Sequence, residues 1–389
     1  MEGRSKRSII ILGCTGSVGT TALQALEHYA HEFEIVGLSA HSNVRQLADI
    51  ATRYNCKHVA ITGTFDAPNL TNLFAPDVAL HFGKSGLLEM IQNVDAYMVL
   101  NAISGADGLE PTFAAISSHK HLALSNKESV VMAGDLLFEH ARKHNTKIIP
   151  VDSEHSALYA LVNTFGKEEV EHLVITASGG PFRLTPLDQM KDITVDMALA
   201  HPTWKMGPKI SVDSATMANK GLEIMEASFL FGFEASSIEV VIHPQSIVHS
   251  LIRLHSGALY AQLSPPDIAL PVMAALSEDF LALRNAVRPL DFTDLQLNFS
   301  APDFTRFPLI QHAYTCTQTR YAYPIAYNAS NEIAVQAFFE GQIPFTKIAD
   351  IVAQTLEFDW MQSVDSLAKI QSIDKEVRRK AAVLVKRSR

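Results

Sequence analysis

A glycine-spaced segment near the N-terminus constrains the fold more than any other feature of this chain. Gly13-Cys14-Thr15-Gly16-Ser17-Val18-Gly19 follows an apolar run at residues 8–13 that predicts a buried strand, and a helical pattern begins at Thr20. Glycines in such a strand–turn–helix unit allow a tight turn, so that N–H groups at the start of the helix face a pyrophosphate. The spacing is GxxGxxG rather than GxGxxG, so a glycine-rich turn without a ligand stays an alternative.

Short apolar runs alternate with helical patterns through the first 150 residues. Further strands are predicted at residues 34–40, 57–62, 97–102, 121–125 and 147–152. This alternation indicates a parallel, doubly wound sheet. We therefore expect a Rossmann-type domain that ends near Pro150.

The pattern changes after Pro150. Strands follow one another closely at residues 238–243, 247–254 and 258–263, after an earlier one at 173–178, and a helix is predicted at 216–231. Sequential strands without intervening helices favour an antiparallel or mixed sheet. From Leu309 onward helical periodicity dominates. The predicted class is α/β, with these parts: an N-terminal Rossmann-type doubly wound sheet (1–150), a central α+β catalytic domain with a mixed sheet (151–277), a linker (278–308) and a C-terminal α-helical domain (309–389).

Composition excludes several classes of partner. The formal net charge is −9, which argues against a broad nucleic-acid-binding surface. The three cysteines form no CxxC motif, as is typical of a protein from a reducing cytosol. No apolar run reaches the length of a membrane span. We therefore expect a cytoplasmic protein that binds neither nucleic acid nor membranes.

The end of the second predicted strand bears on the choice of cofactor. NAD-specific domains commonly place an acidic residue there to bind the ribose 2′-hydroxyl. Here the stretch is Ala40-His41-Ser42-Asn43-Val44-Arg45, which has no carboxylate to repel a 2′-phosphate. NADP(H) is therefore favoured over NAD(H), with Ser42, Asn43 and Arg45 as candidate ligands. Arg45 as a solvated helix residue is the alternative.

Three carboxylates in two short stretches predict a metal site. They are Asp152 and Glu154 in Asp152-Ser153-Glu154, and Glu223 in Asn219-Lys220-Gly221-Leu222-Glu223. Such oxygen ligands favour Mg²⁺ or Mn²⁺ over Zn²⁺. Asp152 or Ser153 as the N-cap of a helix that begins at His155 or Ser156 is the alternative for the first stretch. A surface ion pair between Lys220 and Glu223 is the alternative for the second. Gly221 is costly within a helix, and a nearby ligand would explain it.

Hydroxyl-rich and glycine-rich segments near these carboxylates predict a phosphate site. Ser178-Gly179-Gly180 follows a strand, and residues 211–216 precede the helix that carries Lys220. Small hydroxyls, backbone amides and a lysine suit a phosphate. Between them, residues 201–207 contain Trp204 and predict either a lid that excludes water or a loop that the tryptophan anchors. Lys127, at the end of a strand, is a candidate for polarising a substrate oxygen, or a surface lysine.

Taken in order, these motifs closely resemble the 1-deoxy-D-xylulose 5-phosphate reductoisomerase family. The matching segments span residues 13 to about 338 and are GCTGSVG, NAISGADGLEPT, LALSNKES, PVDSEHSA, ASGGPFR, HPTWKMGPKISVDSATMANKGLEIMEA, HPQSIVHS and NASNEIAVQAF. The resemblance implies conversion of 1-deoxy-D-xylulose 5-phosphate to 2-C-methyl-D-erythritol 4-phosphate in non-mevalonate isoprenoid synthesis. It also implies NADPH, a divalent ion (Mg²⁺, Mn²⁺ or Co²⁺) and a homodimer.

The resemblance also assigns roles to individual residues. The metal ligands that it implies are Asp152, Glu154 and Glu223. The catalytic residues that it implies are Lys127, Glu154 and His201. Substrate contacts are implied at Lys127, Ser153, Glu154, Ser178, His201, Ser214, Asn219, Lys220 and Glu223, of which Ser178, Ser214, Asn219 and Lys220 match the phosphate site. Cofactor contacts are implied at Gly13, Thr15, Gly16, Ser17, Val18, Gly19, Ala40, His41, Ser42, Asn43, Asn126, Glu128 and Gly207. Trp204 and Met206 match a flexible lid.

The chain departs from the family pattern in four places. Ser42 stands where a basic residue is common, Cys14 replaces a small hydroxyl residue, and Ile268 replaces a common methionine. The segment Thr319–Pro324 is also unusual for the family. Two rival functions are an NADP-dependent dehydrogenase of the semialdehyde type without rearrangement, and a nucleotide-sensing protein. Neither would need three carboxylates beside a phosphate site.

Overall fold

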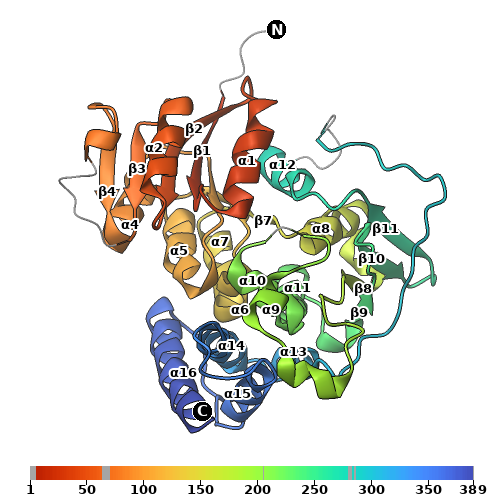
Figure 1. The fold of residues 1–389 in the computed structure, drawn as a ribbon. Coiled ribbons are helices and arrows are strands. Elements are labelled where there is room, and N and C mark those ends of the chain that lie inside the picture. The colour runs from red at the N-terminus through yellow and green to blue at the C-terminus, as the bar shows by residue number, and fades with distance from the viewer. Residues whose placement is uncertain (1–5, 64–70, 205, 279–282, 284–285, 389) are drawn as a thin grey trace. The chain divides into compact units, whose positions relative to one another are not determined.

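The computed structural model describes residues 6–63, 71–204, 206–278, 283 and 286–388 of the chain. The chain divides into two compact units. The first comprises Met1–Asn126, Leu137–Asp152 and Ile268–Val287, and the second comprises Lys127–Leu136, Ser153–Asp267 and Arg288–Arg389. Each unit has a sheet of its own (Figure 1). The domain boundaries predicted at residues 150, 277 and 308 stay predictions.

The first unit is built on a parallel sheet, which confirms the predicted Rossmann-type fold. Within the described residues it has seven strands in the order β4-β3-β2-β1-β5-β6-β7, and each neighbouring pair is parallel. The strands are β1 (Arg7–Leu12), β2 (Phe33–Ala40), β3 (His58–Ile61), β4 (Ala79–Phe82), β5 (Met98–Asn101), β6 (His121–Leu124) and β7 (Ile148–Pro150). The strand order reverses between β1 and β5, and ligands of such sheets bind beyond the carboxyl ends of the strands at this switch point.

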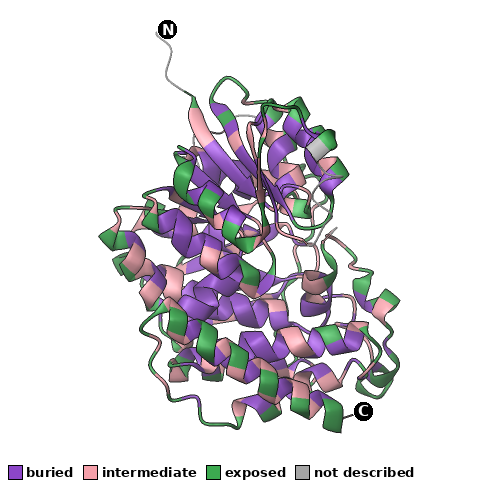
Figure 2. Ribbon diagram, turned by 90° about the vertical axis from the view of Figure 1, so that its left-hand side faces the viewer, coloured by how far each residue is buried: buried purple, intermediate pink, exposed green. Residues whose placement is uncertain are grey.

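Helices cover the first unit's sheet, so its central strands are buried (Figure 2). The helices are α1 (Ser17–Glu27), α2 (Val44–Arg53), α4 (Gly83–Asn93), α5 (Leu109–Ser117), α7 (Asp135–Lys143) and α12 (Ala269–Ser277). Burial of both faces explains the continuous apolar run Ile9–Leu12. Helix α12 comes from a distant part of the sequence and packs against α1, β6 and β7.

The sequence did not predict β4, and its burial explains why. This strand lies at the edge of the sheet and contains no fully buried residue. Its four residues, Ala79-Leu80-His81-Phe82, therefore lack the apolar run by which the other strands are recognised.

The second unit contains the predicted mixed sheet. Its strands are β8 (Val170–Ala177), β9 (Ile238–Ile242), β10 (Val248–Leu254) and β11 (Leu259–Leu263), in the order β11-β10-β8-β9. Strand β10 runs antiparallel to β8 and β11, whereas β8 and β9 are parallel. Helix α8 (Ser153–Phe165) packs against β10 and β11.

The other helices of the second unit include the predicted C-terminal group. They are α6 (Lys127–Ala133), α9 (Val195–Leu199), α10 (Pro208–Ala215), α11 (Ala218–Phe231), α13 (Pro308–Thr319), α14 (Tyr323–Phe339), α15 (Lys347–Leu356) and α16 (Leu367–Arg387). Helix α16 buries one face, because Ile370, Ile373, Val377, Ala381 and Val385 recur at helical spacing. Figure 2 shows this alternation of buried and exposed positions at the C-terminus. Among the described residues, no helix has both the length and the apolar character that crossing a membrane requires.

Three predicted helix starts are wrong by two or three residues. The helix expected from Thr20 begins at Ser17. The helix expected from Thr216 begins at Ala218, because Met217 adopts a left-handed conformation (φ 62°) that separates α10 from α11. Helix α8 begins at Ser153 rather than at His155 or Ser156. Ser153 is therefore its first helical residue and not its cap.

The reason for Gly221 also differs from the prediction of a nearby ligand. A Cβ atom at this position would lie 2.2 Å from the Tyr327 hydroxyl and 3.0 Å from the Ala313 Cβ atom. Glycine is thus required because α11 approaches α13 and α14 closely.

Candidate functional site

The glycine loop lies at the switch point of the first unit's sheet. Gly13 follows β1 with φ 74°, and its N–H donates to the Ser39 hydroxyl over 3.1 Å. A Cβ atom on Gly13 would lie 2.8 Å from the Ala102 carbonyl oxygen, and one on Gly19 would lie 2.4 Å from the Gly13 oxygen. Only glycine fits at both positions, so the loop is held tightly between the ends of the central strands and α1.

A cavity of about 360 Å³ opens beside this loop. Its lining includes five of the predicted cofactor-binding residues: Gly13, Thr15, Gly16, Ala40 and His41. Sequence reasoning missed other lining residues, among them Lys84 on α4 and Asp107, whose side chains form a 2.5 Å ion pair. No sequence signal marked Lys84, because the strand before it, β4, was not recognised.

The polar side chains of the loop after β2 differ in their hydrogen bonds. Asn43 caps α2, since its Oδ1 accepts from the Gln46 N–H (3.4 Å) and its Nδ2 donates to the Gln46 Oε1 (2.6 Å). Ser42 and Arg45 are exposed. Asn43 therefore has a capping role, and its contact with a cofactor phosphate stays a prediction.

Cys14 and Asn126 are both buried near the cavity. Burial, together with the nearby Cys56, raises the pKa of the Cys14 thiol to about 12, so the thiol stays protonated at neutral pH. The Asn126 side-chain amide donates to the carbonyls of Ile103 (2.7 Å) and Gly105 (2.8 Å). Asn126 therefore fixes the loop after β5, whatever its contact with a cofactor.

Two glutamates and two lysines form an ionic network in the second unit. Lys220 Nζ donates to Glu154 Oε1 (3.0 Å) and to Glu223 Oε2. Lys127 Nζ donates to Glu223 Oε1 (3.2 Å) and to Asn219 Oδ1 (2.9 Å). The side chains of Lys127, Lys220 and Glu223 are 6%, 5% and 1% exposed. The interpretation of Lys220 and Glu223 as a surface ion pair is therefore wrong.

The helices α8 and α11 place these groups. Glu154 lies in the first turn of α8, where Ser153 Oγ donates to its Oε2 over 2.5 Å. On α11, Asn219 lies one turn before Glu223, so its Nδ2 donates to Glu223 Oε1. A single cation, the Lys220 ammonium, reaches both carboxylates. Two glutamate carboxylates that converge on one cation offer the oxygen ligands that a hard divalent ion prefers. Asp152 directly precedes α8 in the chain.

The Ser178–Gly180 loop has the features of an anion site. Gly179 and Gly180 adopt left-handed conformations (φ 82° and 67°), and the Gly180 N–H donates to Ser178 Oγ over 3.2 Å. A Cβ atom on Gly180 would lie 2.6 Å from the Ser214 carbonyl oxygen. The loop therefore packs directly against the backbone of Ser214, and amides in such turns form concavities that bind anions.

His201 is paired with Ser178 through its ring. Its Nδ1 accepts from the N–H groups of Thr203 (3.2 Å) and Trp204 (2.9 Å), so the neutral ring carries its proton on Nε2. Nε2 then donates to Ser178 Oγ over 3.2 Å. Burial lowers the pKa of His201, which favours the neutral ring. Because Ser178 Oγ accepts from both His201 and Gly180, its own proton is available to a ligand oxygen.

Glu128 has a cationic partner, Lys209, and its predicted contact with the cofactor stays a prediction. Lys209 Nζ donates to Glu128 Oε1 (2.7 Å) and to Asp213 Oδ2 (2.9 Å), and Asn331 Nδ2 donates to Asp213 Oδ1 (2.7 Å). Burial alone would raise the pKa of Glu128, but the Lys209 ammonium outweighs it and holds that pKa below its ordinary value. Lys209 follows Gly207, the N-cap of α10, so this network anchors the end of the predicted lid segment. Lys205 lies outside the described residues.

Sequence reasoning also missed a buried pair behind Glu223. His155 Nε2 lies 3.0 Å from the Glu223 carbonyl oxygen, and its Nδ1 lies 3.3 Å from Glu226 Oε2. Both side chains are almost fully buried. His155 therefore connects α8 to the backbone of α11 next to the two converging glutamates. The signal in the sequence was its position directly after Glu154.

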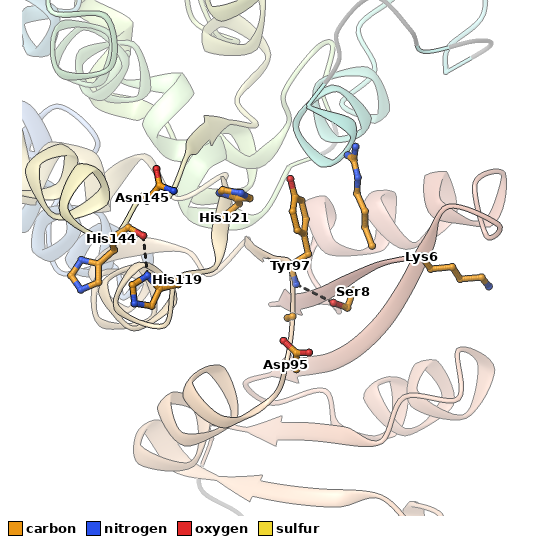
Figure 3. Close-up of a pocket in the computed structure, with 10 residues that line it drawn as sticks. Lys6, Ser8, Asp95, Tyr97, His119, His121, His144 and Asn145 are labelled. Atoms are coloured by element: carbon orange, nitrogen blue, oxygen red, sulfur yellow. Dashed lines mark hydrogen bonds between the residues drawn. The ribbon is translucent and has the colours of Figure 1, made fainter. Parts of the chain in front are cut away.

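A second hollow in the first unit lies at the amino ends of its strands (Figure 3). It brings together His119, His121, His144 and Tyr97. These groups make structural contacts: His119 Nδ1 bonds the His144 carbonyl (3.0 Å), and the Tyr97 N–H donates to Ser8 Oγ (3.0 Å). None of its lining residues is a predicted site residue, so this hollow is not a candidate for the reaction site.

A glycine loop at a switch-point cavity and a buried glutamate–lysine network are together the features of a nucleotide-dependent enzyme with a metal-binding site. Three family models match the chain. They are 1-deoxy-D-xylulose 5-phosphate reductoisomerase over residues 9–134, the C-terminal domain of the same enzyme over 148–231, and the DXP reductoisomerase C-terminal domain over 263–380. The chain belongs to the 1-deoxy-D-xylulose 5-phosphate reductoisomerase family.

Individual relatives are similar in sequence to this chain over nearly its full length. The reductoisomerase of Treponema pallidum is 40% identical over 375 residues, which is 96% of each chain. That of Zymomonas mobilis is 40% identical over 385 residues, covering 97% of this chain and 98% of the relative. A solved structure of the Zymomonas mobilis enzyme in complex with NADPH has a TM-score of 0.90 and 38% identity, covering 98% of this chain and 99% of that one. A DOX-P reductoisomerase in complex with NADPH, fosmidomycin and magnesium has a TM-score of 0.90 and 36% identity, covering 98% of each.

Proposed function

We propose that the chain converts 1-deoxy-D-xylulose 5-phosphate to 2-C-methyl-D-erythritol 4-phosphate in non-mevalonate isoprenoid synthesis. The reaction uses NADPH and a divalent ion, Mg²⁺ or Mn²⁺, with Co²⁺ as a further option. The observation that carries this proposal is the convergence of Glu154 and Glu223 on one cation within a buried network. Relatives solved with NADPH and with magnesium support it. Membership of this family favours it over a semialdehyde-type dehydrogenase or a sensor.

NADPH binding is assigned to the glycine loop and the cavity beside it. The N-terminus of α1, with Gly16 as its N-cap, directly follows the glycine loop, and a helix N-terminus suits the pyrophosphate. Ala40, His41, Ser42 and Asn43 follow β2, where a cofactor ribose is bound in this kind of sheet. Asn126, Glu128 and Gly207 are proposed as further cofactor contacts.

The metal ion is assigned to Asp152, Glu154 and Glu223. When bound, it supplies Lewis acidity that stabilises negative charge on the substrate's ketone and hydroxyl oxygens. Lys127, whose Nζ already donates to Glu223 and Asn219, is placed to donate to a substrate oxygen as well. Glu154, which is more exposed than Glu223, is the candidate for moving a proton.

The substrate phosphate is assigned to Ser178, Ser214, Asn219 and Lys220. The Ser178 hydroxyl is oriented by His201 and the Gly180 amide, as the hydrogen bonds above require. A phosphate fixed in this way holds the carbon skeleton in register while it rearranges. Residues 201–207, with Trp204 and Met206, are proposed to close over the substrate and exclude water.

Product analysis tests this proposal against simple reduction. The purified chain is incubated with ¹³C-labelled 1-deoxy-D-xylulose 5-phosphate, NADPH and Mg²⁺, and the product is examined by NMR. We expect a branched carbon skeleton, with a methyl group on a quaternary carbon. A linear polyol phosphate, or NADP-dependent turnover of an amino-acid semialdehyde instead, would contradict the proposal.

We further propose a cytoplasmic homodimer. Strand β11 lies at the edge of its sheet and exposes Leu259 (54%) and Tyr260 (42%). Exposed apolar residues on an edge strand are suited to pairing with a second copy. Light scattering should give twice the chain mass, and Leu259→Lys should shift it toward the monomer. A monomeric wild-type chain at micromolar concentration would contradict the dimer.

A further inference from the structure

The turn between α13 and α14 carries two residues in a conformation that usually requires glycine. Arg320 has φ 64° and ψ −134°, and Tyr321 has φ 48°. Side chains with a Cβ atom are strained in this region, and strain of this kind is concentrated at functional positions. An arginine is therefore kept here at a conformational cost that glycine would avoid.

The guanidinium of Arg320 is fixed by two contacts, but one of its nitrogens has no hydrogen-bond acceptor among the described residues. It lies 4.4 Å from the centroid of the Phe229 ring, and its Nη2 donates to Ser228 Oγ over 2.8 Å. Its Nη1 is buried and has no hydrogen-bond partner among the described residues. A guanidinium has only donors, so Nη1 needs an acceptor from outside the chain. A buried charged donor without an acceptor is unfavourable.

A pocket of about 200 Å³ lies beside this guanidinium. Its walls are formed by residues 131–136, Phe229, Arg320, Tyr321, Ser363 and Val364, so they combine apolar side chains with polar ones. Among the described residues that line it, Arg320 is the one cation, and Asp135 is exposed at the start of α7. One cation beside one carboxylate does not suit a doubly charged phosphate, whereas a guanidinium matches the two oxygens of a carboxylate.

We propose that this pocket binds a small carboxylate with an apolar body. The carboxylate accepts from Arg320 Nη1, and the apolar body packs against Phe229, Met132 and Val364. The pocket lies at the far ends of α6 and α11 from Lys127 and Asn219, so it is separate from the site assigned to the reaction. The proposal does not depend on the proposed function, because binding is measured without turnover.

Benzoate is a suitable probe, with benzamide as a neutral molecule of the same shape. Calorimetric titration of the full-length chain should show benzoate binding with a Kd on the order of 1 mM or tighter, and benzamide binding at least about tenfold weaker. Arg320→Gly relieves the strained backbone, so it should stay folded, keep its turnover and lose benzoate affinity by at least about tenfold. Tyr321→Gly removes strain but keeps the guanidinium, so it should still bind benzoate.

Each remaining outcome would overturn the proposal. No benzoate binding by the wild-type chain up to about 10 mM would mean that the pocket is not a carboxylate site. Equal binding by the Arg320→Gly variant, or equal binding of benzamide, would mean that Arg320 does not recognise the charge. Tighter binding of inorganic phosphate than of benzoate would assign the pocket to a tetrahedral anion.

Discussion

The two units of this chain prepare their sites by different means. In the first, backbone shape dominates, because Gly13 and Gly19 allow the loop to lie against neighbouring backbone atoms. In the second, buried side chains dominate, since Lys127, Lys220 and Glu223 are almost entirely removed from solvent. Substitutions in the first unit should therefore change cofactor affinity through steric effects. Substitutions in the second should change turnover through charge.

The largest effect is expected from Glu223→Gln. Loss of this charge removes a proposed metal ligand and leaves Lys127 and Lys220 with one carboxylate fewer. Turnover should fall by about 10³-fold or more, while NADPH affinity, measured by fluorescence, stays unchanged. Glu239→Gln, which alters a half-exposed pair with Arg253, is the control and should retain turnover. A fully active Glu223→Gln variant would remove the metal assignment.

Gly19→Ala tests the role of the glycine loop in the first unit. The added Cβ atom would lie 2.4 Å from the Gly13 oxygen, so the loop must shift. Overpacking of this kind costs about 1–3 kcal/mol, and NADPH affinity should fall by about 10- to 100-fold with little change in kcat at saturating NADPH. Gly16→Ala, with a 3.3 Å contact to the same oxygen, should have a smaller effect. Unchanged NADPH affinity in Gly19→Ala would contradict the assignment of the loop.

Lys209→Met should affect stability more than chemistry. It leaves the buried carboxylates of Glu128 and Asp213 without their ammonium, which costs about 3–5 kcal/mol of unfolding free energy. Lys347→Met breaks an exposed pair with Asp350 and should cost less than about 1 kcal/mol. Denaturant unfolding measures both.

The stability of the Lys209→Met variant should depend on pH in a defined direction. In the wild-type chain the lowered pKa of Glu128 gives stability above the ordinary pKa of 4.5, and this stability is lost as pH falls through the lowered value. Without Lys209, burial raises the pKa of Glu128, so the carboxyl group takes up a proton more easily. The stability difference between variant and wild type should therefore narrow as pH decreases. A constant difference across the acid range would argue against this network.

The smallest effect, a change in kcat/KM, is expected from protonation of His201. Burial holds its pKa below the ordinary 6.5, so its contribution is present above that pH and is lost as pH falls through the lowered value. Protonation places a proton on Nδ1, which then no longer accepts from Thr203 and Trp204. The ratio kcat/KM should fall by a few fold on the acid side. In His201→Asn, which retains an acceptor but does not titrate, this fall should move to lower pH.

Local patterns account for what the sequence could predict, and long-range packing accounts for what it could not. Both sheets could be predicted, because strand burial and turn geometry are local properties. The signals were the apolar run Ile9–Leu12, the glycine loop and the closely spaced strands after Pro150. The edge strand β4 lacked such a run, and with it Lys84 was missed. The partners of Glu128 and Gly221 lie on helices far apart in the sequence, so local patterns could not predict Lys209 beside Glu128 or Tyr327 beside Gly221.

Metal-dependent oxidation of NADPH tests the central claim most directly. The purified chain is assayed at 340 nm with 1-deoxy-D-xylulose 5-phosphate, first with Mg²⁺ and then after the metal has been removed with a chelator. We predict oxidation only when substrate, NADPH and metal are all present, and recovery when Mg²⁺ or Mn²⁺ is restored. Oxidation that continues without metal, or none in the complete mixture, would contradict the account.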